Sequence, residues 1–314
     1  MGSFKGLEII NCSAQTDLST ENTSPAYAPF IEGFELKYMP EVNETRLVND
    51  NGGNQLAIKG NAHYEFDGDE HIWCEADSGE SIVNPVCDSR LLACGFSAAN
   101  TTVRTYSPCF EGDYTNVTMY GYSGSKTNGD CNASKAKHMM FEGSIVGKVG
   151  DPLKLRLHGL GVVSAIPTPG NYPSVTMLDD AIPTLTMSAS TICGIAYKIS
   201  EFEIKFGYTV ALLMDGSTNG YVRAQLVPGP AKFTCKALME DMATKTPYTS
   251  LVAGTNGTLS IVTGSGSSIV TIAATGSTAQ FLSVTETDDN GIKMFDIEGQ
   301  FTNNAYTIVF DGSN

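Results

Sequence analysis

Residues 153–158 read Leu-Lys-Leu-Arg-Leu-His, with an apolar side chain at every second position and a polar or charged one between. Residues 202–206, Phe-Glu-Ile-Lys-Phe, repeat this pattern. A period of two places the apolar side chains on one face of an extended strand and the charged ones on the other. Weaker versions occur at residues 117–120 and 306–310. The sequence therefore predicts β-strands with one buried face and one solvated face.

Short turn-forming clusters separate these strands. Asp, Asn and Gly gather at residues 50–53, 66–69, 128–130 and 289–291. Many short strands at such spacing are typical of a sandwich or barrel. Only two stretches, residues 89–94 and 236–243, predict helices; we expect Asp88 to be the N-cap of the first and Gly95 to end it. The predicted fold class is all-β, a sandwich or barrel with short flanking helices.

The composition bounds the class of protein. With 314 residues, of which 41% are hydrophobic, the chain can bury a large core. Its net charge of -15 disfavours nucleic-acid binding, because an acidic surface repels phosphates. The N-terminus lacks a signal-peptide pattern, and no run approaches the roughly 20 apolar residues of a membrane helix. We therefore expect an intracellular product whose eight cysteines are reduced.

Proline density predicts how the chain is divided. Four prolines within residues 166–183 favour an extended linker. The linker separates a first β domain at residues 45–165, preceded by an irregular N-terminal arm at 1–44, from a second β domain at 184–314. Each domain shows strands, a short helix, more strands, and then Glu-Gly leading into an alternating strand. This order indicates an internal duplication; the alternative is one long sandwich whose strands resemble each other.

No catalytic arrangement is predicted. The sequence contains neither a Walker loop nor a Gly-x-Ser-x-Gly elbow. His71 and Cys74 have a spacing that suits two zinc ligands, but no Cys-x-x-Cys completes the set, and a strand with Trp73 in the core is favoured. Acids at residues 67–70 lack the calcium-loop pattern and are interpreted as a solvated turn. We therefore predict no enzyme, cofactor or metal site.

Several short elements, in order, resemble a known family. They are Leu-Leu-Ala-Cys-Gly-Phe at 91–96, Tyr-Ser-Pro at 106–108, Thr-Asn-Val-Thr-Met-Tyr at 115–120, Phe-Glu-Gly at 141–143, the strand at 202–210 and the element at 223–228. Together, over roughly residues 65–310, they resemble siphophage tail tube proteins, also called major tail proteins. The chain departs from that pattern in its cysteines and in its long N-terminal region.

The resemblance implies a structural virion protein and not an enzyme. In that family β-sandwich subunits join sheets into rings, and the rings stack into the tube through which DNA is ejected. It implies rings that are hexameric, or trimeric and pseudo-hexameric if the chain is duplicated. It further implies a tape measure protein in the lumen, DNA in transit without specific binding, and no membrane partner. The expected location is the virion tail, assembled in the host bacterial cytoplasm.

The polar stretch at residues 123–135 is expected to form a long loop between two strands. In the family such a loop reaches the adjacent ring; the alternative is a solvated loop tip. The predicted inter-ring contact residues are Gly124, Lys126, Thr127, Asn128, Asp130 and Lys135. The competing function is a secreted or surface β-sandwich binding module, an adhesin or a carbohydrate-binding domain.

Overall fold

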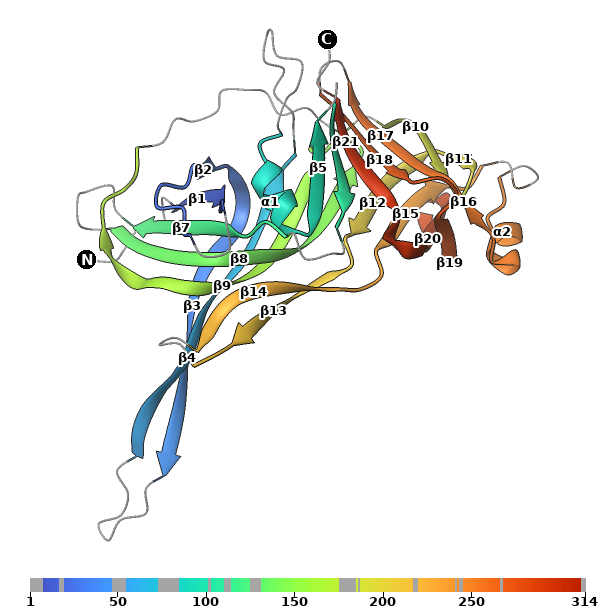
Figure 1. Ribbon diagram of the computed structural model, residues 1–314. Helices are drawn as coiled ribbons and strands as arrows, with labels where there is room; N and C mark the ends of the chain where they lie inside the picture. The colour runs from blue at the N-terminus through green and yellow to red at the C-terminus, as the bar shows by residue number, and fades with distance from the viewer. Residues whose placement is uncertain are drawn as a thin grey trace.

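The structure is a computed structural model that describes residues 8–16, 20–46, 55–72, 85–100, 103–109, 114–124, 131–174, 185, 187–216, 220–240, 242, 245–265 and 268–311. Strands dominate it (Figure 1), and the prediction of an all-β fold is confirmed. The helices in this part of the chain are α1 (Asp88–Ala93), α2 (Tyr248–Ala253) and a 3-10 turn at Thr302–Asn304. Within the described ranges, no helix has the length and apolarity needed to cross a membrane.

Twelve strands of the described chain form the larger sheet, and their pairings are antiparallel. They are β1 (Glu8–Ala14), β2 (Tyr27–Ala28), β3 (Phe30–Arg46), β4 (Gln55–His71), β7 (Val117–Gly124), β8 (Cys131–Lys148), β9 (Lys154–Gly170), β12 (Ile199–Lys205), β15 (Lys232–Leu238), β16 (Asn256–Gly257), β19 (Ala279–Asp289) and β20 (Ile292–Phe301). The order is β16-β19-β20-β15-β12-β8-β7-β1-β2, and β9, β4 and β3 branch from β8. The long strand β8 therefore joins both parts of the sheet.

A smaller sheet packs against the inner face of the larger one (Figure 1). Its order is β11 (Ile195–Tyr197), β10 (Met187–Ile192), β17 (Leu259–Ser265), β18 (Ser268–Ala274), β21 (Tyr306–Asp311), β6 (Arg104–Pro108) and β5 (Phe96–Asn100). Aromatic rings join the layers: the Phe96 and Phe206 centroids lie 4.8 Å apart, and Tyr306 stacks on Phe301 at 4.7 Å. Such contacts bury large apolar areas and make a two-layer sandwich.

One hairpin extends away from the sandwich, and a second packs beside it with Val210, Ala224 and Leu226 buried in the core. β3 and β4 leave it together as a two-stranded arm, and β13 (Tyr208–Met214) pairs with β14 (Tyr221–Pro228) in a separate ribbon beside it (Figure 1). The tip of the ribbon contacts the arm: Tyr221 donates a hydrogen bond to Glu41 at 3.2 Å, and its ring meets the His63 ring with centroids 5.8 Å apart. The ribbon and the arm thus support each other.

Both sheets contain strands from each half of the chain. β12 pairs with β8 in the larger sheet, and β21 pairs with β6 in the smaller one. The element order β4-α1-β5-β6-β7-β8-β9 is matched by β15-α2-β17-β18-β19-β20-β21, except that the two-residue β16 is added after α2. The pairing differs, because β4 pairs with β9 whereas β15 pairs with β20. The duplication therefore stays a prediction, and the two halves share one sandwich.

The alternating stretches form strands as predicted. Residues 153–158, 202–206, 306–310 and 117–120 fall in or at the ends of β9, β12, β21 and β7. The turn at 289–291 is also confirmed: it joins β19 to β20, with φ of 54° at Asn290 and 84° at Gly291. Two successive positive φ values are typical of the tight hairpin turn that Asn-Gly favours.

Other expectations are wrong. Residues 236–238 of the predicted helix lie in strand β15 instead. Phe233, Cys235 and Ala237 alternate toward the core, and β15 is paired along both edges. The turn predicted at 66–69 lies within β4, where Gly68 allows close approach to Phe34: a Cβ there would lie 2.9 Å from the Phe34 Cβ. In this strand the glycine serves packing, not a turn.

The ends of the predicted first domain also need correction. The N-terminal region at 1–44, expected to be irregular, contributes β1, β2 and most of β3 to the larger sheet. The first residues of the linker predicted at 166–183 are part of β9, which continues to Gly170 and pairs there with Cys131. Residues 175–184 lie outside the described ranges. Pairing with β8 overrides the proline signal in β9.

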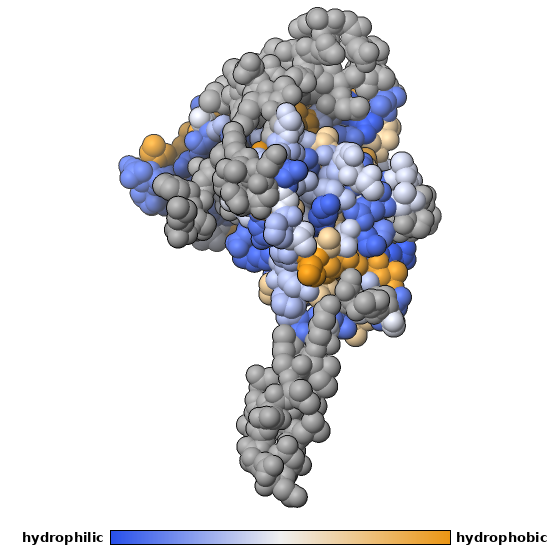
Figure 2. Space-filling model, turned by 90° about the vertical axis from the view of Figure 1, so that its left-hand side faces the viewer, coloured by the Kyte–Doolittle hydropathy of each residue, from blue (hydrophilic) through white to orange (hydrophobic). Residues whose placement is uncertain are grey.

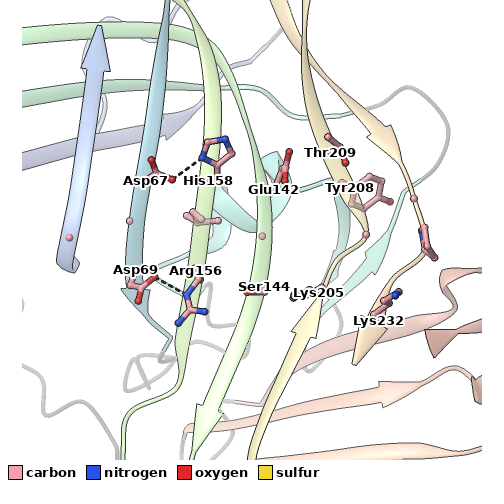
Figure 3. Close-up of a pocket in the computed structure, with 17 residues that line it drawn as sticks. Asp67, Asp69, Glu142, Ser144, Arg156, His158, Lys205, Tyr208, Thr209 and Lys232 are labelled. Carbon is pink, nitrogen blue, oxygen red and sulfur yellow. Dashed lines mark hydrogen bonds and ion pairs between the residues drawn. The ribbon is translucent and has the colours of Figure 1, made fainter. Parts of the chain in front are cut away.

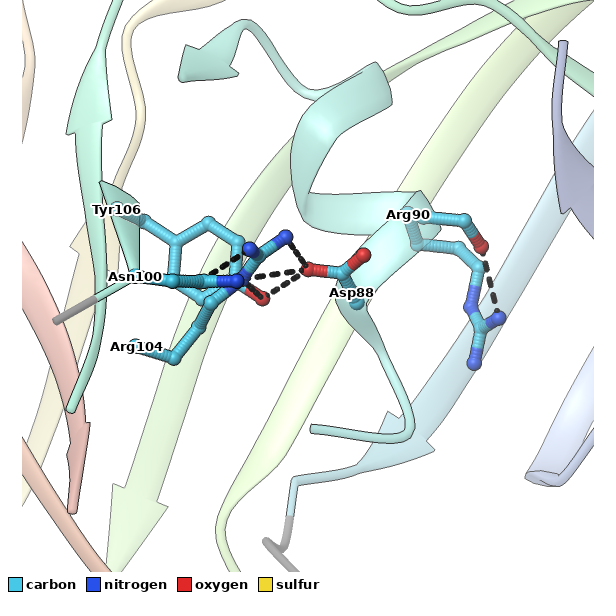
Figure 4. Close-up of polar contacts among 6 residues, drawn as sticks. Asp88, Arg90, Asn100, Arg104 and Tyr106 are labelled. Carbon is cyan, nitrogen blue, oxygen red and sulfur yellow. Dashed lines mark hydrogen bonds and ion pairs between the residues drawn. The ribbon is translucent and has the colours of Figure 1, made fainter. Parts of the chain in front are cut away.

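The predicted first helix is confirmed as α1, and Gly95 follows it with φ of 89°. The N-cap, however, is Cys87, not Asp88. The Asp88 carboxylate instead accepts hydrogen bonds from Arg104 Nε at 3.0 Å and from the Tyr106 hydroxyl (Figure 4). Both partners lie on β6, so Asp88 ties the helix to the smaller sheet.

A buried ion pair ties α1 to the larger sheet. Arg90 is 3% exposed and Glu70, on β4, is fully buried. Arg90 Nε donates to Glu70 Oε2 at 3.0 Å, and its Nη2 donates to Glu70 Oε1 and to the Val86 carbonyl. Burial alone would lower the pKa of the guanidinium, but the Glu70 carboxylate outweighs it, and the net pKa is raised. The paired, charged state is therefore the one the fold stabilises.

Seven cysteines lie in the described part of the chain, and all seven carry free thiols. Burial raises the pKa of the Cys12 thiol to about 12 and raises that of Cys94 well above its usual value. Both contribute to the core cluster. They act as small apolar side chains and not as reactive nucleophiles.

Replacing Glu70 by Gln is expected to lower the free energy of unfolding by about 3–5 kcal/mol, because it leaves the buried Arg90 charge uncompensated. Chemical denaturation of the purified protein measures this. The matched control is Glu35→Gln on neighbouring β3, whose side chain is exposed and pairs only with exposed Lys37; we expect a change within about 0.5 kcal/mol. Equal, small effects of the two substitutions would contradict the role of the ion pair.

Candidate functional site

The outward face of the larger sheet carries the densest set of polar groups in the described structure. On β9, Leu155 and Leu157 are buried, whereas Arg156 and His158 point to the other face. The same alternation on β4 buries Phe66 and leaves the acids at 65, 67 and 69 outward. The alternation at 153–158 predicted the outward side chains of β9, whereas the acids of β4 were expected in a turn.

Strand register aligns these side chains in rows across the sheet. One row is formed by Asp67, His158 and Glu142, from β4, β9 and β8. A second row lies two residues further along each strand, on the same face. It is formed by Asp69, Arg156, Ser144, Lys205 and Lys232, from β4, β9, β8, β12 and β15. We call these two rows the polar face.

The polar face lines a hollow of about 740 Å³ (Figure 3). Asp67 and Asp69 lie toward one side of it and Lys205 and Lys232 toward the other. The start of β13 forms its far wall, where the Tyr208 hydroxyl donates to the Cys109 carbonyl at 3.0 Å. Burial, with smaller contributions from Tyr114 and Cys109, raises the pKa of Tyr208, so this hydroxyl stays neutral.

Ion pairs and hydrogen bonds join neighbouring strands within each row. His158 Nδ1 lies 2.8 Å from Asp67 Oδ1, and Arg156 Nε lies 3.5 Å from Asp69 Oδ1 (Figure 3). Glu142 joins the sheet to β13: its Oε1 accepts a hydrogen bond from the Val210 backbone N–H at 3.0 Å. These side chains are half-exposed, so each pair contributes little stability. Their effect is to fix the pattern of charge on the surface.

Toward β20, basic side chains lie next to acidic ones, so their charges balance. Glu203 accepts a hydrogen bond from the Ser144 hydroxyl at 3.0 Å and lies 3.9 Å from both Arg156 and Lys205. Lys232 pairs with Glu298 at 3.2 Å. A surface of alternating, paired charges holds water well and offers little net attraction to a polyanion.

The predicted contact loop is only partly described. Lys126, Thr127, Asn128 and Asp130 lie outside the described residues. Gly124 is the last residue of β7, and Lys135 lies within β8, where its Nζ sits 4.9 Å from the Tyr120 ring centroid. The expected excursion at 123–135 is therefore too long, because β7 and β8 pair from Gly124 and Cys131 inward. Lys135 belongs to the sheet and not to the loop.

Sequence reasoning placed Arg156 and His158 on one face of a strand but did not join them to their partners. The pairing of β9 with β4 sets those neighbours, and pairing register has no local signal here. Gly207 is another position without a clear signal. It has φ of 79°, and a Cβ there would lie 2.5 Å from backbone atoms of Pro230 and Ala231. This contact is where the ribbon of β13 and β14 leaves the larger sheet.

Replacing Gly207 by Ala is expected to destabilise the protein by at least about 2 kcal/mol, because the positive φ disfavours a side chain and the obstructing atoms are backbone. Thermal unfolding measures this. The control is Gly216→Ala, since Gly216 has nothing within 4 Å of an added Cβ. A Gly207 variant as stable as the Gly216 variant would show that the backbones can separate without cost.

Comparison with models of known protein families gives no match, and comparison with curated proteins gives none either.

Proposed function

We propose that this chain is a structural subunit of a bacteriophage tail tube, which assembles with copies of itself into stacked rings around a channel for DNA. Two features support this proposal: the resemblance in the order of sequence elements, and the arrangement of the strand edges. It assigns the chain no catalytic role.

The observation that carries the proposal is a set of strands with one unpaired edge. Within the described residues, β3 pairs only with β4, β5 only with β6, and β11 only with β10. An exposed edge presents backbone N–H and C=O groups that can pair with another chain. Copies of the same subunit, placed around a closed ring, satisfy these groups at every interface.

Exposed apolar side chains give a second point of support. Leu213, Met214, Val222 and Val227 lie on the ribbon of β13 and β14, and Met214 is 69% exposed. Figure 2 shows apolar surface gathered at the end of the molecule where the arm of β3 and β4 leaves the body. Apolar surface of this kind is stabilised when another protein covers it.

The polar face fits the wall of a channel. Arg156 pairs with Asp69 and Lys232 with Glu298 across neighbouring strands, and Lys205 pairs with Glu203 within β12, so the face presents little net positive charge to DNA. Phosphates bind where cations are unpaired and release counterions. We therefore assign the polar face to the lumen, where DNA passes without sticking, and the strand edges to contacts between subunits.

Purified protein is expected to form rings or tubes with a central hole, visible by negative-stain electron microscopy, because edge pairing drives self-association. Raising the protein concentration should lengthen the tubes. A protein that stays monomeric at every concentration and ionic strength, and that binds glycans, would reject the proposal in favour of a binding module.

Replacing residues 126–130 by Gly and Ser residues of equal number is expected to stop growth at isolated rings, while β7 and β8 remain intact. The reason is the predicted role of this loop in contacts between rings. Microscopy and circular dichroism measure assembly and folding. The same replacement at the exposed residues 288–291, at the turn between β19 and β20, is the control and should leave tubes normal. Full-length tubes from the 126–130 variant would refute the loop's role.

A further inference from the structure

Asp67 and His158 of the first row, together with Glu65 beside them, have the chemistry of a metal site. Glu65 and Asp67 extend from β4 and His158 from β9, and one ligand atom from each lies within 4.8 Å of the others. The backbone imposes this grouping: Asp67 and His158 are register partners, and Glu65 is two residues from Asp67 on the same face. We propose that these residues bind a divalent transition-metal cation, with His158 Nε2 and Glu65 as its protein ligands and Asp67 as a positioning residue.

Asp67 orients the imidazole. His158 Nδ1 lies 2.8 Å from Asp67 Oδ1, so the proton of the neutral ring sits on Nδ1 and donates to the carboxylate. The lone pair is then on Nε2. Metal-binding histidines typically donate their second ring N–H to a carboxylate in this way, which fixes the tautomer and makes the ligand more basic.

The two ligand atoms lie close enough for one ion to bind both. His158 Nε2 and Glu65 Oε1 lie 4.0 Å apart, which is too long for a hydrogen bond between them. Zinc lies about 2.0–2.1 Å from a histidine nitrogen and about 2.0–2.2 Å from a carboxylate oxygen, and its tetrahedral geometry places two such atoms roughly 3.4 Å apart, so a small rotation of the partly exposed Glu65 side chain would bring both atoms to one ion. Both side chains are partly exposed, which leaves room for water in the remaining positions.

The surroundings favour a cation at this point. Glu142 faces His158 from β8, and its carboxylate is engaged by the Val210 N–H. Arg156, the cation next along β9, is drawn toward Asp69 and Glu203 instead. Lys37 on β3, the register partner of Glu65, also lies near these acids, and its ammonium pairs with Glu35 at 3.0 Å. Three carboxylates therefore lie on the strands beside one imidazole. One nitrogen with carboxylate oxygens is a donor set for zinc, cobalt or manganese, whereas calcium prefers oxygen ligands alone.

The test is a titration of the metal-free full-length protein with Co²⁺, followed by visible absorption, and competition with Zn²⁺. We expect one equivalent of Co²⁺ with nitrogen and oxygen ligands and no sulfur-to-cobalt charge-transfer band. His158→Gln and Glu65→Gln should weaken binding at least about tenfold, and Asp67→Asn should weaken it about tenfold through loss of the oriented tautomer. The expected melting temperature without metal is that of the wild type for all three.

The control is Asp69→Asn, which removes one carboxylate from the same face of β4 without touching the three residues. It should leave Co²⁺ affinity within about twofold. The inference is overturned if Asp69→Asn weakens binding as much as Asp67→Asn, which would indicate diffuse attraction by an acidic surface. It is also overturned if His158→Gln binds as the wild type does, or if no Co²⁺ absorption appears. These outcomes do not depend on whether the chain assembles into tubes.

Discussion

The buried ion pair between Arg90 and Glu70 is the interaction on which the spacing of the two sheets depends. A six-residue helix has little stability of its own. Here α1 is held at two points, by Arg90 to the larger sheet and by Asp88 to the smaller one. Because these two side chains are only two residues apart, the helix acts as a short brace between the layers. The brace adds to the pairing of β4 with β3 and β9, which sets the pattern of outward charges.

The sharing of strands between halves makes the subunit a single unit of folding. β8 continues from its contacts with β7 and β9 into its pairing with β12, so the first half cannot complete its sheet without the second. β6 is likewise completed by β21. An assembly built from such subunits receives edges and surfaces already fixed in shape, which lowers the entropic cost of association.

Local pattern was enough to predict the fold class and the outward direction of the β9 side chains, but not the acids of β4, which were expected in a turn, nor the partners across the sheet. The alternation at 153–158 gave the outward direction of Arg156 and His158, and Asn290-Gly291 gave its hairpin turn. Residues 236–238 read equally well as helix or strand, and only pairing with β12 and β20 decides between them. The proximity of His158 to Glu65 and Asp67 follows from register between strands about 90 residues apart, which no local signal encodes.

The irregular shape of the β3 edge limits which strands can pair with it. A bulge at Gly33, with φ of 65°, and a proline at position 40 interrupt its ladder with β4. Both devices normally protect an edge from indiscriminate pairing, because a bulge bends the strand and proline removes a donor. An interrupted edge still accepts a partner whose own shape follows the interruptions. In a ring of identical subunits every interface presents the same pair of surfaces, so one fit repeats throughout, and this favours ordered assembly over aggregation.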